Sequence, residues 1–401
     1  MTSSDTTRNF DRIRNQGYIW GLIGSALFVI FGVLGGTRYG FAGWQTLFRS
    51  YLFAYLYWFC IPSGCMAILM LHHLTGGRWG YPLRRILEAG SRSLWVMAAL
   101  FIPIFFGISE LYEWARPDVV AQDPILQNKR WWLTTHAFII RAVIYFAILL
   151  LIVTLLNKWS RAQDETGDLK YKSKMTAFSA PGVILWAFVV TGAAVDWVMS
   201  LEPHWFSTIY GFVWIIIEVL AAMSFAVFTL RMLADREPIK DVVDPLRFND
   251  LGNLMLTFLM LWAYMSFDQL LIVWAGNLKD EIPWYSQRAF GGWAPVALIL
   301  VILHFFVPFF LLLQRRIKRQ PRRLSAVAAL IVCLTLVDVY WVVVPAFYKS
   351  APQVHWLDLF ALVGIGGLWL GTFMGQLKKL PLLPLHDPRF EGVLLEPEHG
   401  D

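Results

Sequence analysis

Ten long apolar segments constrain the fold of this chain more than any other feature of its sequence. A helix needs about 20 mostly apolar residues to cross the hydrocarbon core of a bilayer. Only 15% of the residues are charged, against roughly 25% in soluble domains. The sequence therefore predicts an all-α membrane protein with ten transmembrane helices. The segments cover residues 17–35, 51–71, 93–115, 133–157, 180–202, 207–233, 249–275, 290–313, 325–348 and 355–377.

Lysine and arginine are unevenly distributed between the two sets of loops. With ten spans both termini lie on one side, and that side carries 25 of the 34 basic residues, whereas the opposite loops carry 8. Because basic loops stay in the cytoplasm, we expect both termini to be cytoplasmic. The same bias explains the net charge of +6. The expected partner of the basic surface is a lipid bilayer, and no nucleic acid is needed to explain it.

The loops are too short to form a soluble domain. We expect two four-helix bundles, with the first and last spans flanking them. The expected parts are a cytoplasmic N-tail (1–16), a ten-helix transmembrane domain (17–377) with bundles at about 51–202 and 207–348, and a cytoplasmic C-tail (378–401).

Ionisable residues inside the apolar segments are candidate functional residues, because a charge in hydrocarbon costs at least about 2.5 kcal/mol. Toward the outer end of the predicted bundle they are Glu110, Glu113, His136, Arg141 and Asp196. If their helices are neighbours, these side chains reach a similar depth. A His–carboxylate pair there would bind the head of a quinol and accept its protons. The alternative is a buried ion pair in which Arg141 neutralises an acid and holds helices together.

A second group of candidates lies deeper in the predicted bundle. Glu218 is near the middle of its span and shares a helix face with Tyr210 and Trp214. Asp268 shares a face of the next span with Tyr264 and with Asn253 and Thr257. Two such stripes facing each other would carry protons, whereas the alternative is ordinary interhelical hydrogen bonding. The predicted proton path comprises Asp196, Glu218, His136, Arg141, Asp268, His304 and Asp338, and the candidate quinone-binding residues are Glu110, Glu113, His136 and Asp196.

The sequence offers few ligands for a redox cofactor. Its three cysteines, Cys60, Cys65 and Cys333, form neither a haem-attachment motif nor a set for an iron–sulfur cluster. We therefore predict no catalytic residue, no metal site and no covalently bound cofactor, and we retain quinone and lipids as candidate ligands. Most of the 20 tryptophans are interpreted as anchors at the membrane interfaces.

Two long motifs carry a resemblance to a known family. The first runs from Asp196 to Gly211 and includes Asp-Trp-Val-Met-Ser-Leu-Glu-Pro-His-Trp-Phe. The second runs from Leu261 to Leu278 and is followed by Glu-Ile-Pro-Trp-Tyr at 281–285. Both resemble the second quinone-binding-type membrane subunit of bacterial alternative complex III, often called ActF, in the NrfD/PsrC-like family. Phe-Ser-Gln is common in that family where this chain has Phe267-Asp268-Gln269, so the role of Asp268 is less secure.

The resemblance implies a subunit of a quinol:cytochrome c oxidoreductase in the bacterial inner membrane. The implied partners are a sister NrfD-like subunit that oxidises quinol, an iron–sulfur subunit, c-type cytochrome subunits and small membrane subunits. Haem c and iron–sulfur clusters would reside on those partners, and this chain would contribute a proton-translocation path or a quinone or lipid site. The alternatives are a purely structural scaffold subunit and a proton-coupled secondary transporter.

Overall fold

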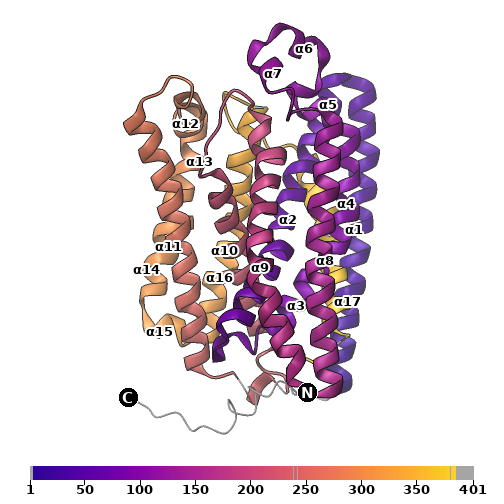
Figure 1. The fold of residues 1–401 in the computed structure, drawn as a ribbon, viewed down its shortest axis with the longest axis vertical. Coiled ribbons are helices and arrows are strands. Elements are labelled where there is room, and N and C mark those ends of the chain that lie inside the picture. The colour runs from indigo at the N-terminus through magenta and orange to yellow at the C-terminus, as the bar shows by residue number, and fades with distance from the viewer. Residues whose placement is uncertain (1–2, 238, 242, 380, 385–401) are drawn as a thin grey trace.

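The described part of the chain is a set of long helices packed side by side. The computed structural model describes residues 3–379 apart from 238 and 242, together with residues 381–384. Within these ranges no strand occurs, and ten helices are long and apolar enough to cross a membrane. They coincide with the ten predicted segments. The fold is therefore that of a multi-pass helical membrane protein (Figure 1).

Some spans are single helices and others change helix type along their length. The unbroken ones are α1 (Ser3–Tyr39), α2 (Phe41–Thr75), α8 (Thr135–Thr166), α10 (Tyr210–Leu233), α11 (Pro245–Gly276) and α17 (Trp356–Leu377). The third span consists of α3 (Arg84–Arg92), α4 (Leu94–Phe101), η2 (Ile102–Gly107) and α5 (Ile108–Leu111), and the fifth of α9 (Leu169–Ala193), η4 (Ala194–Val198) and η5 (Met199–Leu201). The eighth consists of α13 (Ala294–Ile299), η8 (Leu300–Phe306) and α14 (Val307–Leu313), and the ninth of α16 (Pro321–Val343) and η9 (Val344–Ala346).

Short helices connect the spans at both ends of the bundle. They are η1 (Arg78–Gly80), η3 (Glu113–Ala115), α6 (Pro117–Gln122), α7 (Pro124–Asn128), η6 (Ile239–Asp241), α12 (Ile282–Ala289), η7 (Gly291–Trp293) and α15 (Arg315–Lys318). Figure 1 shows α6, α7 and α12 at one end of the bundle, which we call the capped end. The opposite end, which carries α15 and the turn between α8 and α9, is called the basic end.

The start of α1 and the end of α17 meet at the basic end. Lys378 Nζ donates to Asp11 Oδ2 at 2.6 Å, which links the two segments directly. Residues 3–16 of the predicted N-tail form the first turns of α1. Most of the predicted C-tail, residues 380 and 385–401, lies outside the described residues.

The helix α2 occupies the centre of the bundle. It packs against α1, α3, α9, α10, α16 and α17, and nearly all residues of its most apolar stretch are buried. A helix that is apolar on every face has no preferred outer side, so it stabilises the fold best where it is surrounded. The central position of α2 brings its side chains into contact with elements from both halves of the chain.

Glycines allow α1 and α17 to approach each other closely. Gly17 and Gly21 on α1 are four residues apart, as are Gly367 and Gly371 on α17, and such spacing favours close helix pairing in membranes. A Cβ atom on Gly21 would lie 2.5 Å from the backbone nitrogen of Leu368. The first and last spans therefore form one tight pair alongside α2, which also packs against both.

Gly64 sets the separation of the two central helices, α2 and α10. A Cβ atom at this position would lie 2.1 Å from the backbone oxygen of Glu218. We expect Gly64→Ala to force the helices apart and to destabilise the protein by about 1–3 kcal/mol, as overpacking does. The matched control is Gly35→Ala, because a Cβ there meets nothing within 4 Å. Thermal unfolding in detergent checks this, and equal melting temperatures for both variants would contradict the expected contact.

Two connections are shorter than the sequence predicts. Residues 36–50 and 158–179 lie between predicted spans, but α1 and α2 are joined at Gly40 alone, and α8 and α9 are joined by residues 167 and 168. Gly40 and Gly167 both have positive φ, which glycine adopts without steric cost. Hydropathy locates the part of a helix that lies in hydrocarbon. It does not detect polar turns that continue the same helix into water.

Candidate functional site

Asp196 lies near the capped end of the fifth span, inside the π-helix η4. A π-helical turn holds an extra residue and is frequent at functional sites. The Asp196 side chain is buried. Arg141 donates two hydrogen bonds to its carboxylate, from Nε to Oδ2 at 2.7 Å and from Nη2 to Oδ1 at 2.9 Å. The indole N–H of Trp132 and the hydroxyl of Tyr145 each donate to the same carboxylate at 2.9 Å.

Arg141 is held as firmly as its partner. Its guanidinium lies 4.1 Å from the centre of the Trp132 ring and donates to the Trp132 carbonyl at 2.9 Å. A bidentate pair supported by an aromatic face is among the strongest ionic contacts in proteins. Asp196 and Arg141 thus form a neutral, well-satisfied pair that fixes α8 against α9. This geometry favours the structural interpretation of the pair.

The other predicted members of the outer cluster lie elsewhere. His136 is exposed on α8, five residues before Arg141, so it projects about 140° away from it. Glu110 accepts a hydrogen bond from Ser109 at 2.7 Å, and Glu113 lies 3.9 Å from Arg116. The side chains that bond to the Asp196 carboxylate in the described part of the chain are Arg141, Trp132 and Tyr145, and His136 and the two glutamates are not among them. The predicted five-residue cluster is therefore not formed, and only Arg141 and Asp196 meet.

Glu218 lies at the contact between the central helices α2 and α10 and is fully buried. Ser63 Oγ donates to its Oε2 at 2.5 Å, and Trp214 Nε1 donates to its Oε1 at 3.0 Å. Ser63 in turn accepts a bond from Trp186 Nε1 at 3.0 Å. In the described residues no Lys or Arg forms an ion pair with Glu218, in contrast to Asp196. An isolated carboxylate at such a depth is costly, and taking up a proton removes that cost.

Asp338 on α16 is a second buried acid that lacks a cationic partner in the part of the chain that the structure describes. Trp262 Nε1 donates to its Oδ2 at 2.8 Å. The Trp262 ring stacks on His304, with 4.5 Å between centroids, and His304 lies in the second π-helix, η8. His304 and Asp338, both members of the predicted proton path, are therefore connected through the Trp262 indole that lies between them.

Cys60 and Tyr210 lie between these groups and the capped end. Cys60 on α2 is buried and within electrostatic reach of both Glu218 and Asp338. Tyr210, at the first turn of α10, is within electrostatic reach of Asp338, Glu202 and Arg288. Polar groups are thus spaced from Glu218 to the turn that precedes α10. We call Glu218, Cys60, Asp338, Tyr210 and Glu202 the acid chain.

Glu202 closes the acid chain at the capped end. It forms an ion pair with Arg288 of α12, which is fully buried and also donates to the Val342 carbonyl at 3.0 Å. Close by, Trp205 stacks on Trp284 with 4.6 Å between centroids. These contacts join the segment 196–211 to the segment 281–285. The two motifs that carry the family resemblance therefore meet in space.

The polar stripe on α11 faces outward. Asn253 and Thr257 are exposed, Tyr264 is 61% exposed, and Asp268 is half-buried. Glu218 instead faces α2. The prediction that the two stripes face each other is wrong, because helical periodicity shows which residues share a face without showing which face turns inward. Asp268 accordingly lies apart from the acid chain.

Tryptophans have a role inside the bundle that their sequence positions did not reveal. Trp132, Trp214 and Trp262 each donate an indole N–H to a buried carboxylate. Buried tryptophans generally need such a partner for the N–H group. The sequence analysis places Trp214 on the helix face of Glu218, whereas it gives no indication that Trp132 and Trp262 are donors to buried acids. A usable signal exists only for Trp214, which stands four residues before Glu218 and so on the same helix face.

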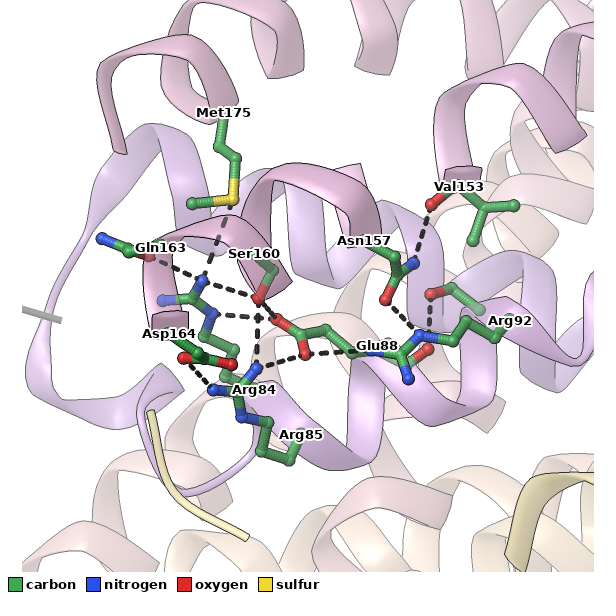
Figure 2. Close-up of polar contacts among 11 residues, drawn as sticks. Arg84, Arg85, Glu88, Arg92, Val153, Asn157, Ser160, Gln163, Asp164 and Met175 are labelled. Carbon is green, nitrogen blue, oxygen red and sulfur yellow. Dashed lines mark hydrogen bonds and ion pairs between the residues drawn. The ribbon is translucent and has the colours of Figure 1, made fainter. Parts of the chain in front are cut away.

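A dense polar cluster that the sequence analysis missed lies at the basic end, where α3 meets α8 (Figure 2). Arg84 Nε lies 3.0 Å from Glu88 Oε1, and Arg85 Nη1 lies 2.7 Å from Glu88 Oε2. Arg85 also pairs with Asp164 at 2.5 Å, and Arg92 reaches to within 3.5 Å of Glu88. We call these five residues the Glu88 cluster. From the sequence, its arginines indicate only which side of the membrane the loop lies on.

An open cavity of about 430 Å³ lies at the capped end beside Asp196. Lys129 stands at this cavity and donates to the Pro203 carbonyl at 2.6 Å, and burial lowers the pKa of its ammonium group. Aromatic walls and few polar groups suit a planar ligand head. The residues that line it include Trp131, Trp132, Trp205, Phe206 and Ser200.

Comparison of the sequence with protein-family models and with curated proteins gives no match in either case. Across the described ranges, no three His, Cys, Asp or Glu side chains are grouped so that they could hold a metal ion.

Proposed function

We propose that this chain is an integral membrane subunit of a quinol-oxidising electron-transport complex, related to the second quinone-binding-type subunit of alternative complex III. It would reside in the bacterial inner membrane with the basic end and both termini in the cytoplasm. The resemblance of the segments 196–211 and 261–285, and the stacking of Trp205 on Trp284 that joins them, support this assignment. The proposal includes the two four-helix bundles at about 51–202 and 207–348, which α2 and α10 would hold together.

Proton transfer through the acid chain is the activity that we assign to this subunit. The observation that carries the proposal is Glu218, which is fully buried between α2 and α10 and whose hydrogen-bond donors among the described residues are Ser63 and Trp214. A carboxyl group without a cation exchanges its proton at lower electrostatic cost than one locked to an arginine. Such an intramembrane acid is characteristic of proton relays.

The order of groups in the acid chain suggests a route for the relay. Glu218 would exchange its proton with Asp338 past Cys60, and Asp338 with the Glu202 carboxylate by way of Tyr210. The Tyr210 hydroxyl can donate and accept, so it can pass a proton without holding a charge. Arg288 would keep Glu202 in place at the capped end, which is the outer end in the proposed orientation.

A quinone head would enter the cavity beside Asp196. Trp132 lines that cavity and also donates to the Asp196 carboxylate, so the ligand and the ion pair would share one side chain. The subunit would carry no redox centre of its own. Haem c, iron–sulfur clusters and primary quinol oxidation are assigned to partner subunits, as the resemblance implies.

A scaffold function is the second candidate, and a specific observation favours it. Asp196 is neutralised by Arg141, and Glu88 is surrounded by three arginines, so two of the most buried acids serve helix packing. In that reading Glu218 would be a third packing element at the central interface. The two candidates differ in the consequence of removing the proton-binding group from Glu218.

Membership of a complex can be tested by affinity purification of the tagged chain from native membranes in mild detergent. We expect partners that show haem c absorption and the electron paramagnetic resonance signal of iron–sulfur clusters, together with a sister NrfD-like subunit. The purified assembly should reduce an added acceptor with a soluble quinol. Recovery of the chain alone as a stable particle would contradict the proposal and would favour a secondary transporter.

A further inference from the structure

A cavity of about 600 Å³ opens at the basic end beside the Glu88 cluster. It lies between the end of α3, the start of α4, the last turns of α8 and the end of α17. Trp95 contributes one wall and is 57% exposed, while Val153 contributes part of another. Gln376 closes it from α17. The cavity thus combines an apolar surface that faces the lipid with a mouth at the polar end of the bundle.

Positive charge dominates the polar part of this cavity. Arg92, Lys158 and Arg161 line it, and Glu165 is the acid among its lining residues. Lys158 and Arg161 are exposed on α8. The lining therefore has an excess of two positive charges. A ligand that complements it carries negative charge next to an apolar portion.

Arg92 connects the cavity to the Glu88 cluster and is itself built into the structure. Its side chain is about nine-tenths buried, and its Nε donates to Asn157 Oδ1 at 2.6 Å. Figure 2 shows the guanidinium lying beside Asn157, apart from Asp164. Its Nη1 is buried with no hydrogen-bond partner in the described residues, and Nη2 lies 3.5 Å from Glu88. A buried donor left without a partner is costly, so an acceptor group at this point would stabilise it.

Several acidic side chains lie near Arg92, and none of them fully neutralises the positive charge of the cavity. Glu88 is already paired with Arg84 and Arg85, and Asp164 is paired with Arg85. Glu165 is exposed at the mouth. Because the nearby acids are engaged or solvated, the excess charge of Arg92, Lys158 and Arg161 remains available to an external anion.

We propose that this cavity binds the phosphate group of an anionic phospholipid, with Arg92 as the buried contact and Lys158 and Arg161 as the outer contacts. Basic pockets between transmembrane helices are a known mode of binding anionic headgroups. The apolar wall of Trp95 and Val153 would receive the first part of an acyl chain. The binding is independent of quinol chemistry and goes beyond the proposed function.

Native mass spectrometry of the delipidated full chain, with whatever partners copurify, tests the proposal. The probes are phosphatidylglycerol, phosphatidylcholine and inorganic phosphate. We expect retention of phosphatidylglycerol over phosphatidylcholine. Retention should be about thirtyfold weaker in the double variant Lys158→Gln/Arg161→Gln, because each cation near an anionic headgroup contributes about 1 kcal/mol. Both side chains are exposed, so this variant should fold normally.

The matched control is Arg316→Gln/Arg319→Gln, which removes two exposed cations, one from α15 and one directly after it, at the same end of the bundle. It should retain phosphatidylglycerol as the unmodified chain does. If millimolar inorganic phosphate displaces the lipid, the cavity binds phosphate groups but its ligand is a soluble phosphate, and the lipid assignment is overturned. Equal retention of the two lipids, or equal loss in both double variants, would overturn the proposal.

Discussion

Glu218→Gln is expected to abolish proton movement by the assembled complex while leaving its assembly intact. Glutamine is nearly isosteric, and Ser63 and Trp214 donate to separate oxygens of the native carboxyl, at 2.5 and 3.0 Å. The amide oxygen of glutamine can accept the Trp214 bond, and its NH2 group can donate to the Ser63 hydroxyl. It cannot bind and release a proton. Since general acid–base groups contribute about 10²-fold or more to the steps that they serve, we expect the proton flux to fall by roughly 100-fold.

Proteoliposomes provide the measurement for this variant. The purified complex is supplied with a quinol and an electron acceptor, and proton movement is followed with a pH-sensitive dye. Electron transfer measured with an uncoupler should persist, because quinol oxidation is assigned to a partner subunit. Glu237→Gln is the control, since Glu237 is exposed near the basic end, away from the acid chain. Coupled proton movement at the native rate in Glu218→Gln would leave only the scaffold function.

Arg141→Met is expected to be the most destabilising substitution at the capped end. It leaves the buried Asp196 carboxylate without the cation that provides two of its hydrogen bonds. Breaking a buried ion pair from one side costs about 3–5 kcal/mol, and we expect about 3 kcal/mol here because Arg141 is 15% exposed. The free energy of unfolding in detergent measures the effect. Arg130→Gln, which removes an exposed cation nearby, should change it by no more than about 0.5 kcal/mol.

The double variant Arg141→Met/Asp196→Leu separates structure from function at this site. Removing both charges eliminates the uncompensated carboxylate, so much of the lost stability should return. If the pair serves only to pack α8 against α9, the double variant should also move protons at the native rate. Restored stability with lost proton movement would instead assign Asp196 to the path, against the interpretation that its geometry favours.

The apolar segments and the cost of charge within them made two features of this protein predictable. All ten spans coincide with helices of the structure, because hydrocarbon thickness imposes a length that hydropathy reads directly. The same cost singled out Asp196, Glu218 and Asp338, and all three are buried. These properties depend on composition over about 20 residues, which a linear sequence records.

The partners of those acids were decided only by the packing of the helices. Asp196 meets Arg141, which lies 55 positions earlier, whereas Glu218 has no cationic partner among the described residues. Periodicity identifies the residues on one face of a helix and leaves the rotation of that face open, so the stripe of α11 could not be known to face outward. The Glu88 cluster was hidden for a related reason. Its charges are ordinary in a polar loop, and they become a buried network only when α8 covers α3.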